Sequence, residues 1–198
     1  MERHTKGLKN GFVTADIVRL AVLAGSSYVL MFFAFPVIPL VSYMKIDFSD
    51  MPVLIATVIT GPPLGGIIVA GVKSLLYWIT TGASIPNLIG VGSSFVSSIV
   101  IVEAFYYSEK YLHKFNRPAR ITLTILNMAV ALAVVMGILN WLVVTPLYMN
   151  LLGLKLSIPV TQLVLVAVIP FNLIKGILVG LVFIFVRQRV LPRLKIKE

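Results

Sequence analysis

Long stretches without a charged side chain constrain this sequence more than any other feature. They cover residues 20–44, 51–72, 74–102, 121–154 and 156–174. About 20 apolar residues cross the roughly 30 Å hydrocarbon core of a bilayer as a helix, so stretches of this length predict membrane-spanning helices. Only 12% of the residues are charged, against about 25% in a soluble domain. We therefore expect an all-α membrane protein, with residues 1–198 forming a single integral-membrane domain.

Basic residues gather in three short segments, and these predict the orientation of the chain. The segments hold Arg3, Lys6 and Lys9; Lys110, Lys114, Arg117 and Arg120; and Arg187, Arg189, Arg193, Lys195 and Lys197. By the positive-inside rule all three face the cytoplasm, which places both termini there. A nucleic-acid-binding surface would need one contiguous basic face with base-stacking aromatics, and the spacing offers none. The net charge of +10 is thus explained by topology.

Six transmembrane helices follow from this orientation. They are expected at residues 13–35, 51–60, 64–80, 87–107, 121–144 and 160–187. A long outer loop, residues 36–50, joins the first two helices. Pro146 is expected to stop the fifth helix, which leaves residues 146–159 as a second outer loop.

Motifs for catalysis are missing from the sequence. The string Gly-Ile-Ile-Val-Ala-Gly-Val-Lys-Ser at residues 66–74 resembles a phosphate loop, but the lysine is displaced by one residue and the string lies in an apolar span. His4 and His113 both lie in basic segments without catalytic partners. There are no cysteines, so Cys-ligated metals are excluded. We predict that the protein is not an enzyme and holds no metal.

Polar side chains stranded in the last two spans indicate a ligand site. Lys175 lies about 22 Å along its helix from the outer end, too deep for an easy reach to either membrane surface. Asn172 shares its face, three residues earlier. Asn140, next to Trp141, lies near the outer end of the fifth span. An isolated asparagine can instead serve an interhelical hydrogen bond, the interpretation we favour for Asn127.

The first outer loop carries a second polar cluster. Lys45, Asp47 and Phe48, together with Tyr43, could form a lid over an outward-facing pocket; the alternative is an ordinary exposed ion pair. Asp50, just before Pro52, is expected to cap the following helix.

Several strings resemble the riboflavin-binding S components of energy-coupling factor (ECF) vitamin transporters, the RibU family. The most specific are Met-Lys-Ile-Asp-Phe-Ser-Asp-Met-Pro at residues 44–52 and Pro-Phe-Asn-Leu-Ile-Lys-Gly at residues 170–176. Further matches are Gly61-Pro62 with Lys73 downstream, Ile-Leu-Asn-Trp at 138–141, Pro-Leu-Tyr at 146–148 and Ala-Val-Leu-Ala-Gly at 21–25. The likeness runs from about residue 15 to 186 in consistent order.

The resemblance implies a six-helix protein of the bacterial cytoplasmic membrane that captures riboflavin near the outer surface. It implies as partners a transmembrane coupling subunit and two ATPase subunits, with Ala21 and Gly25 at the coupling-subunit interface. Asn140, Asn172 and Lys175 would contact riboflavin, and Lys73 and Asn87 complete the candidate set. Riboflavin would be transported cargo, so no cofactor is expected.

Two departures from the family pattern keep alternatives open. The family's Asn-Phe near the start of the fourth helix has only Asn87-Leu88 here. The family often has Glu-Ala-x-Lys-Asn on the third helix, where this chain has Ala-Gly-Val-Lys-Ser at residues 70–74. The ligand could therefore be another vitamin, such as pantothenate, pyridoxine or folate. A rival of another class is an intramembrane enzyme or scaffold; an enzyme would need a carboxylate or histidine at pocket depth, and only Glu103 comes close.

Overall fold

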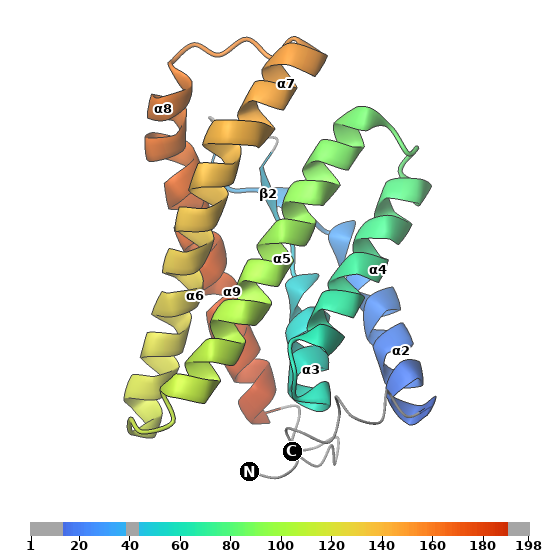
Figure 1. Ribbon diagram of the computed structural model, residues 1–198, viewed down its shortest axis with the longest axis vertical. Coiled ribbons are helices and arrows are strands. Elements are labelled where there is room, and N and C mark those ends of the chain that lie inside the picture. Colours follow the sequence, from blue (N-terminus) through green and yellow to red (C-terminus); the bar gives the residue numbers. More distant parts are fainter. Residues whose placement is uncertain (1–13, 39–43, 190–198) are drawn as a thin grey trace.

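The apolar stretches form a bundle of long helices in the computed structural model, which describes residues 14–38 and 44–189 (Figure 1). The elements are α2 (Thr14–Met31), β1 (Phe35–Pro36), β2 (Lys45–Ile46), α3 (Asp50–Thr60), α4 (Leu64–Thr80), α5 (Ile85–Tyr111), α6 (Arg117–Leu139), α7 (Thr145–Leu152), α8 (Val160–Leu163) and α9 (Ile169–Arg189). Two short π-helical segments, η2 (Asn140–Val144) and η3 (Val164–Val168), join α6 to α7 and α8 to α9.

The helix ends sort into two groups, as the predicted topology requires. The start of α2, the α3–α4 and α5–α6 connections and the end of α9 lie together at the lower end of Figure 1. The α4–α5 and α7–α8 connections lie at the opposite, upper end. Residues 14–31, 63–80, 85–111, 117–152 and 160–189 form five helices that are long and apolar enough to cross a membrane. The 11 residues of α3 are apolar but shorter, so a sixth full span remains a prediction.

The fifth predicted helix is longer than the sequence suggested. We expected Pro146 to end it, but residues 117–152 continue as one helical rod through η2 and α7. In η2 the Thr145 N–H bonds to the Asn140 carbonyl, five residues back. This wider turn shifts the hydrogen-bond register just before a proline that cannot donate, so the helix survives. The same arrangement recurs where η3 precedes Pro170, with the Ile169 N–H bonded to the Val164 carbonyl.

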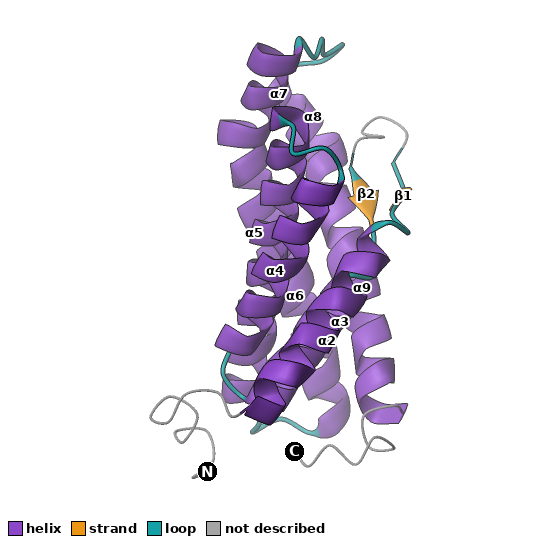
Figure 2. Cartoon of the chain, turned by 90° about the vertical axis from the view of Figure 1, so that its right-hand side faces the viewer, coloured by secondary structure: helices purple, strands orange, loops and turns teal. Residues whose placement is uncertain are grey.

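The first outer loop also has more structure than expected. The first helix ends at Met31 rather than at residue 35, and Phe35 and Pro36 pair with Ile46 and Lys45 in an antiparallel sheet. Figure 2 shows these strands at one side of the bundle, directly above the start of α3. The hairpin therefore delivers residues 47–50 to the interior of the upper half.

Small residues set the packing of the lower half. A Cβ added at Gly176 of α9 would lie 2.5 Å from the Ala129 Cα of α6, and one added at Gly180 would lie 3.1 Å from the Ile125 side chain. Phe105 and Phe183 pack edge-to-face beside this contact, with ring centroids 5.1 Å apart. Here the small-residue spacing on α9 serves packing within the chain.

Candidate functional site

A cavity of about 290 Å³ opens among the upper ends of the helices. Its wall comes from the ends of α2 and α4, the first half of α5, the end of α6 with η2 and α7, and the start of α9. Residues in or beside the two strands complete it: Ala34, Met44, Lys45 and Asp47. Three aromatic side chains, Tyr77, Tyr148 and Phe171, contribute ring surface. The cavity combines apolar and polar walls inside a helix bundle, which is typical of small-molecule sites.

Asn140 and Asn172 face this cavity from two different helices in the same way. Both are buried, with exposed fractions of 2% and 1%, and both line the cavity. The Asn140 Nδ2 donates to the Met136 carbonyl and the Asn172 Nδ2 to the Val168 carbonyl, each at 2.8 Å and four residues back. Each amide is thereby anchored to its own helix, and its side-chain carbonyl is left as an acceptor for a ligand.

Lys175 joins the two asparagines at the cavity wall and is held by two partners. Its Nζ donates to the Ser97 hydroxyl of α5 at 2.8 Å and lies 3.2 Å from the Asp50 Oδ2 as an ion pair. Ser97 also lines the cavity, whereas Asp50 lies behind the wall. An ammonium has three donors, so Lys175 retains a donor for a ligand.

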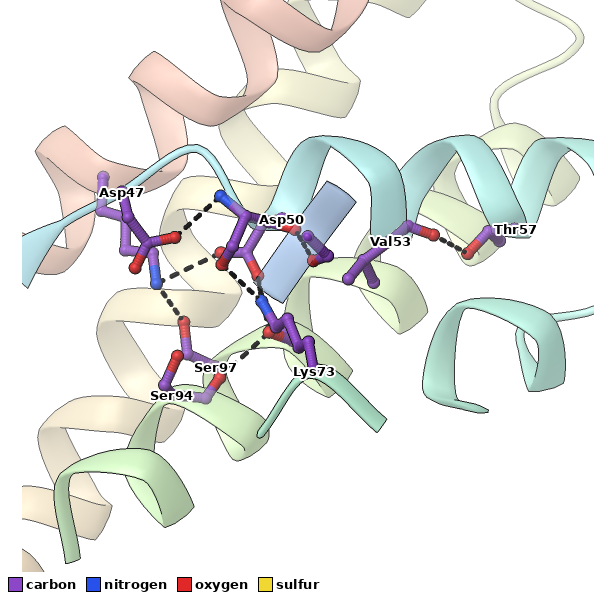
Figure 3. Close-up of polar contacts among 11 residues, drawn as sticks. Asp47, Asp50, Val53, Thr57, Lys73, Ser94 and Ser97 are labelled. Carbon is purple, nitrogen blue, oxygen red and sulfur yellow. Dashed lines mark hydrogen bonds and ion pairs between the residues drawn. The ribbon is translucent and has the colours of Figure 1, made fainter. Parts of the chain in front are cut away.

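Lys73, which the resemblance placed among the riboflavin-binding candidates, does not line the cavity. It is fully buried. Its Nζ donates to the Ser49 hydroxyl at 2.6 Å and to the Asp50 Oδ1 at 2.9 Å (Figure 3). Ser98 donates to the same carboxylate oxygen at 2.5 Å. Lys73 therefore serves the interior behind the cavity, and its contact with a ligand is not favoured by its position.

Asp50 has a different role from the helix cap we expected. Its carboxylate is 1% exposed and lies between Lys73 and Lys175. The cap position, Ser49, makes no side-chain capping bond. Sequence reasoning missed this ion pair because the three charges come from three separate elements. The available signal was charge balance: two deeply stranded lysines require a carboxylate, and Asp50 is the first residue of an apolar helix.

Of the candidates from the first outer loop, two line the cavity and one does not. Lys45, which is exposed, and Asp47, which is 8% exposed, both line the cavity. Asp47 Oδ1 accepts a 2.8 Å hydrogen bond from the Ser49 N–H, which shapes the entry into α3. Phe48 packs against the core and against Phe35 rather than on the cavity wall. Tyr43 lies outside the described residues.

Of the remaining two candidates, Asn87 lines the cavity and Trp141 does not. The Asn87 Nδ2 is bonded to the Thr81 carbonyl at 2.6 Å. Trp141 is 50% exposed on the outside of the bundle. Asn127, as predicted, makes interhelical bonds instead, to the Ala104 carbonyl at 3.0 Å and to Ser108 at 2.9 Å. Glu103 is likewise absent from the cavity lining, where the carboxylate present is that of Asp47.

The cavity thus offers a defined set of polar groups on a largely apolar, aromatic wall. Two carbonyl acceptors, one buried ammonium and the hydroxyls of Ser93, Ser94 and Ser97 surround it. The Ser93 oxygen is buried without a hydrogen-bond partner among the described residues. In those residues, no group of three or more His, Cys, Asp or Glu side chains could hold a metal ion. Such a site has the aromatic surface and the few polar groups that a small organic ligand requires.

Residues 15–187 match the family described as "ECF transporter, substrate-specific component". The chain is also similar to a solved structure reported as "Structure and mechanism of the S component of a bacterial ECF transporter". That similarity has a TM-score of 0.74 at 31% identity and covers 91% of this chain and 98% of the other.

Two curated relatives cover most of the chain at about one-third identity. The riboflavin transporter FmnP of Bacillus subtilis (strain 168) is 33% identical over 179 residues, 87% of this chain and 91% of the relative. The riboflavin transporter RibU of Staphylococcus aureus (strain TCH60) is 33% identical over 183 residues, 90% and 92% of the two chains.

Proposed function

Because the chain belongs to the family of substrate-specific components of ECF transporters, a multi-pass cell-membrane family, we propose that it captures riboflavin. Binding takes place in the cavity of the upper half, at the outer face of the membrane. A transmembrane coupling subunit and two ATPase subunits then drive delivery into the cell. The observation that carries this proposal is the trio of Asn140, Asn172 and Lys175 on the cavity wall. Similarity to the two riboflavin transporters supports it.

The chemistry of riboflavin suits these groups. Its isoalloxazine ring has flat apolar faces for Tyr77, Tyr148 and Phe171, and its polar edge alternates carbonyl oxygens with one N–H. The asparagine carbonyls are available to accept from that N–H, while Lys175 can donate to a ring oxygen or nitrogen. The ribityl hydroxyls can pair with serine hydroxyls on α5, which would give the buried Ser93 oxygen a partner.

The charge on Lys175 argues against an acidic vitamin. Pantothenate or folate would use a buried lysine as counter-ion to a carboxylate. Lys175 already lies 3.2 Å from the Asp50 carboxylate, and Asp47 contributes a second carboxylate to the cavity wall. A neutral ligand avoids placing a further negative charge among these groups.

The simplest test is the absorbance spectrum of the protein purified from cells grown with riboflavin. Bound flavin gives a band near ~450 nm, close to that of the free chromophore. Titration of the ligand-free protein with riboflavin, pantothenate, pyridoxine and folate then ranks the vitamins. Binding of riboflavin alone is expected; selective binding of another vitamin would replace riboflavin in the proposal.

The face of α2 carrying Ala21 and Gly25 is proposed as the contact with the coupling subunit. Ala21 is exposed, and a Cβ added at Gly25 would meet no heavy atom within 4 Å among the described residues. This small-residue pair therefore does not serve packing in the described part of the chain and leaves room for a close helix. Gly25→Leu should abolish riboflavin uptake in cells while the purified variant binds riboflavin normally. Equal losses of uptake and binding would contradict the assignment.

A further inference from the structure

A buried charge cluster lies directly behind the cavity and is not part of its wall. Asp50, Lys73 and Ser98 meet there on α3, α4 and α5, each 1% exposed or less (Figure 3). Ser49 extends the cluster, since its hydroxyl accepts from Lys73 and its backbone carbonyl accepts from Ser27 of α2. Five helices, α2 to α5 and α9, thus supply polar groups to one point.

The two oxygens of the Asp50 carboxylate have different partners. Oδ1 is saturated by two hydrogen bonds, from Lys73 at 2.9 Å and Ser98 at 2.5 Å. Oδ2 makes no hydrogen bond among the described residues and lies 3.2 Å from the Lys175 Nζ. One oxygen therefore fixes the carboxylate within the bundle, and the other is turned toward the cavity lysine.

This arrangement determines where the Lys175 ammonium lies. A lysine has a long flexible stem, and the charged end would move if the carboxylate were absent. The second contact, with the Ser97 hydroxyl at 2.8 Å, joins the ammonium to a neutral acceptor and so adds no attraction between opposite charges. The cluster carries two positive charges and one negative, and the single carboxylate pairs with both lysines, with Lys73 through Oδ1 and with Lys175 through Oδ2.

We propose that Asp50 is a positioning residue for ligand binding: it is held by Lys73 and Ser98 and orients the Lys175 ammonium toward the ligand. This inference rests on the proposed function, because riboflavin is the ligand whose binding is measured in the test. It assigns the two buried lysines separate tasks, with Lys73 supporting the carboxylate from behind and Lys175 contacting the ligand.

The test compares the effect of Lys175→Met in two backgrounds, measured by quenching of riboflavin fluorescence. In the natural chain, loss of the Lys175 donor should weaken binding by roughly 5- to 150-fold. In the Asp50→Asn/Lys73→Met background, which removes one charge of each sign, binding should already be weakened to a similar degree. Adding Lys175→Met there should change it by no more than about threefold, because coupled residues are non-additive.

A merely structural role of Asp50 would give a different result, since Lys175→Met would then cost the same factor in both backgrounds. That additive outcome, or undiminished binding by the Asp50→Asn/Lys73→Met variant, overturns the inference. Asp16→Asn is the matched control, because Asp16 pairs with Arg19 at 3.3 Å on the exposed surface of α2; its binding should be unchanged.

Lys73→Met alone keeps the test decisive if the double variant does not fold. It leaves Asp50 and Lys175 as a neutral pair with Ser98 still bonded to the carboxylate, so we expect riboflavin binding to weaken, but by less than Lys175→Met weakens it. A loss as large as that of Lys175→Met would overturn the division of tasks between the lysines. Failure of the unaltered protein to bind riboflavin would instead contradict the proposed function.

Discussion

Lys175 and Gly176 are neighbours on α9, yet Lys175 faces a polar cavity and Gly176 faces a close contact between two helices. Lys175 lines the cavity among polar groups, while Gly176 allows α9 to touch the Ala129 backbone of α6. Above this point α6 continues into the π segment η2 and α9 is preceded by the π segment η3, each close to a proline, and Asn140 and Asn172 face the cavity. Below it Gly176 and Gly180 of α9 lie against α6, and Phe183 of α9 packs against Phe105 of α5.

The comparison shows how one bundle combines a binding site with a rigid support. In the upper half, the side-chain carbonyls of Asn140 and Asn172 are at the cavity wall, and the Ser93 hydroxyl is buried without a hydrogen-bond partner among the described residues. A ligand in the cavity could pair with these groups. The lower half buries its surface in close helix contacts that no ligand affects. Variants in the upper half should accordingly change affinity, and those in the lower half should change stability.

The largest expected difference between the halves is how readily a maleimide added outside intact cells reaches a cysteine at each end of the bundle. The chain has no cysteines, so single cysteines report cleanly. Ser157→Cys, exposed in the α7–α8 connection, should react fully with a membrane-impermeant maleimide. His113→Cys, exposed in the α5–α6 connection, should react only with a permeant reagent. Labelling of position 113 from outside would invert or break the predicted topology.

The next largest effect should follow from filling the contact between α6 and α9. Gly176→Leu places a Cβ 2.5 Å from the Ala129 Cα, so the backbone must move at a cost of about 1–3 kcal/mol or more. Thermal unfolding in detergent should show a lower melting temperature. Gly25→Leu, where added atoms meet open space among the described residues, is the control and should unfold as the natural protein does. Equal stability of both variants would contradict close packing in the lower half.

An intermediate effect is expected at the cavity wall. Asn172→Ala and Lys175→Met should each weaken riboflavin binding by roughly 5- to 150-fold, because buried ligand groups lose their partners. Asn127→Ala is the matched control, since its amide bonds Ala104 and Ser108 in the lower half. Fluorescence quenching titrations on the three variants are sufficient. Similar affinities for all three would move the site away from α9.

The smallest effect is expected at Trp141, a residue that the sequence placed in the site. Its ring is 50% exposed on the outside of the bundle. Trp141→Phe should therefore change riboflavin affinity by less than about twofold, as surface substitutions usually do. A loss as large as that of Lys175→Met would mean that the ring reaches the ligand.

Much of the fold could be predicted from the sequence because bilayer thickness and apolar length are directly related. Each of the six stretches predicted to span the membrane is helical over most of its length, and burial of Asn140, Asn172 and Lys175 followed from their isolation among apolar residues. The extension past Pro146 could not be predicted, because a π segment overrides the usual effect of proline. The tasks of Asp50 and Lys73 depend on contacts among α3, α4, α5 and α9, which residue spacing does not contain.

The central claim is that the asparagine carbonyls and Lys175 recognise the polar edge of riboflavin. It is tested most directly by titrating the purified protein with riboflavin and with riboflavin methylated on the ring N–H between the two carbonyls. Methylation removes the N–H from which the Asn140 and Asn172 side-chain carbonyls are placed to accept a hydrogen bond. The affinity for the methylated flavin should therefore be lower by at least about fivefold. Equal affinity for the two flavins, or no binding of riboflavin, would contradict the account.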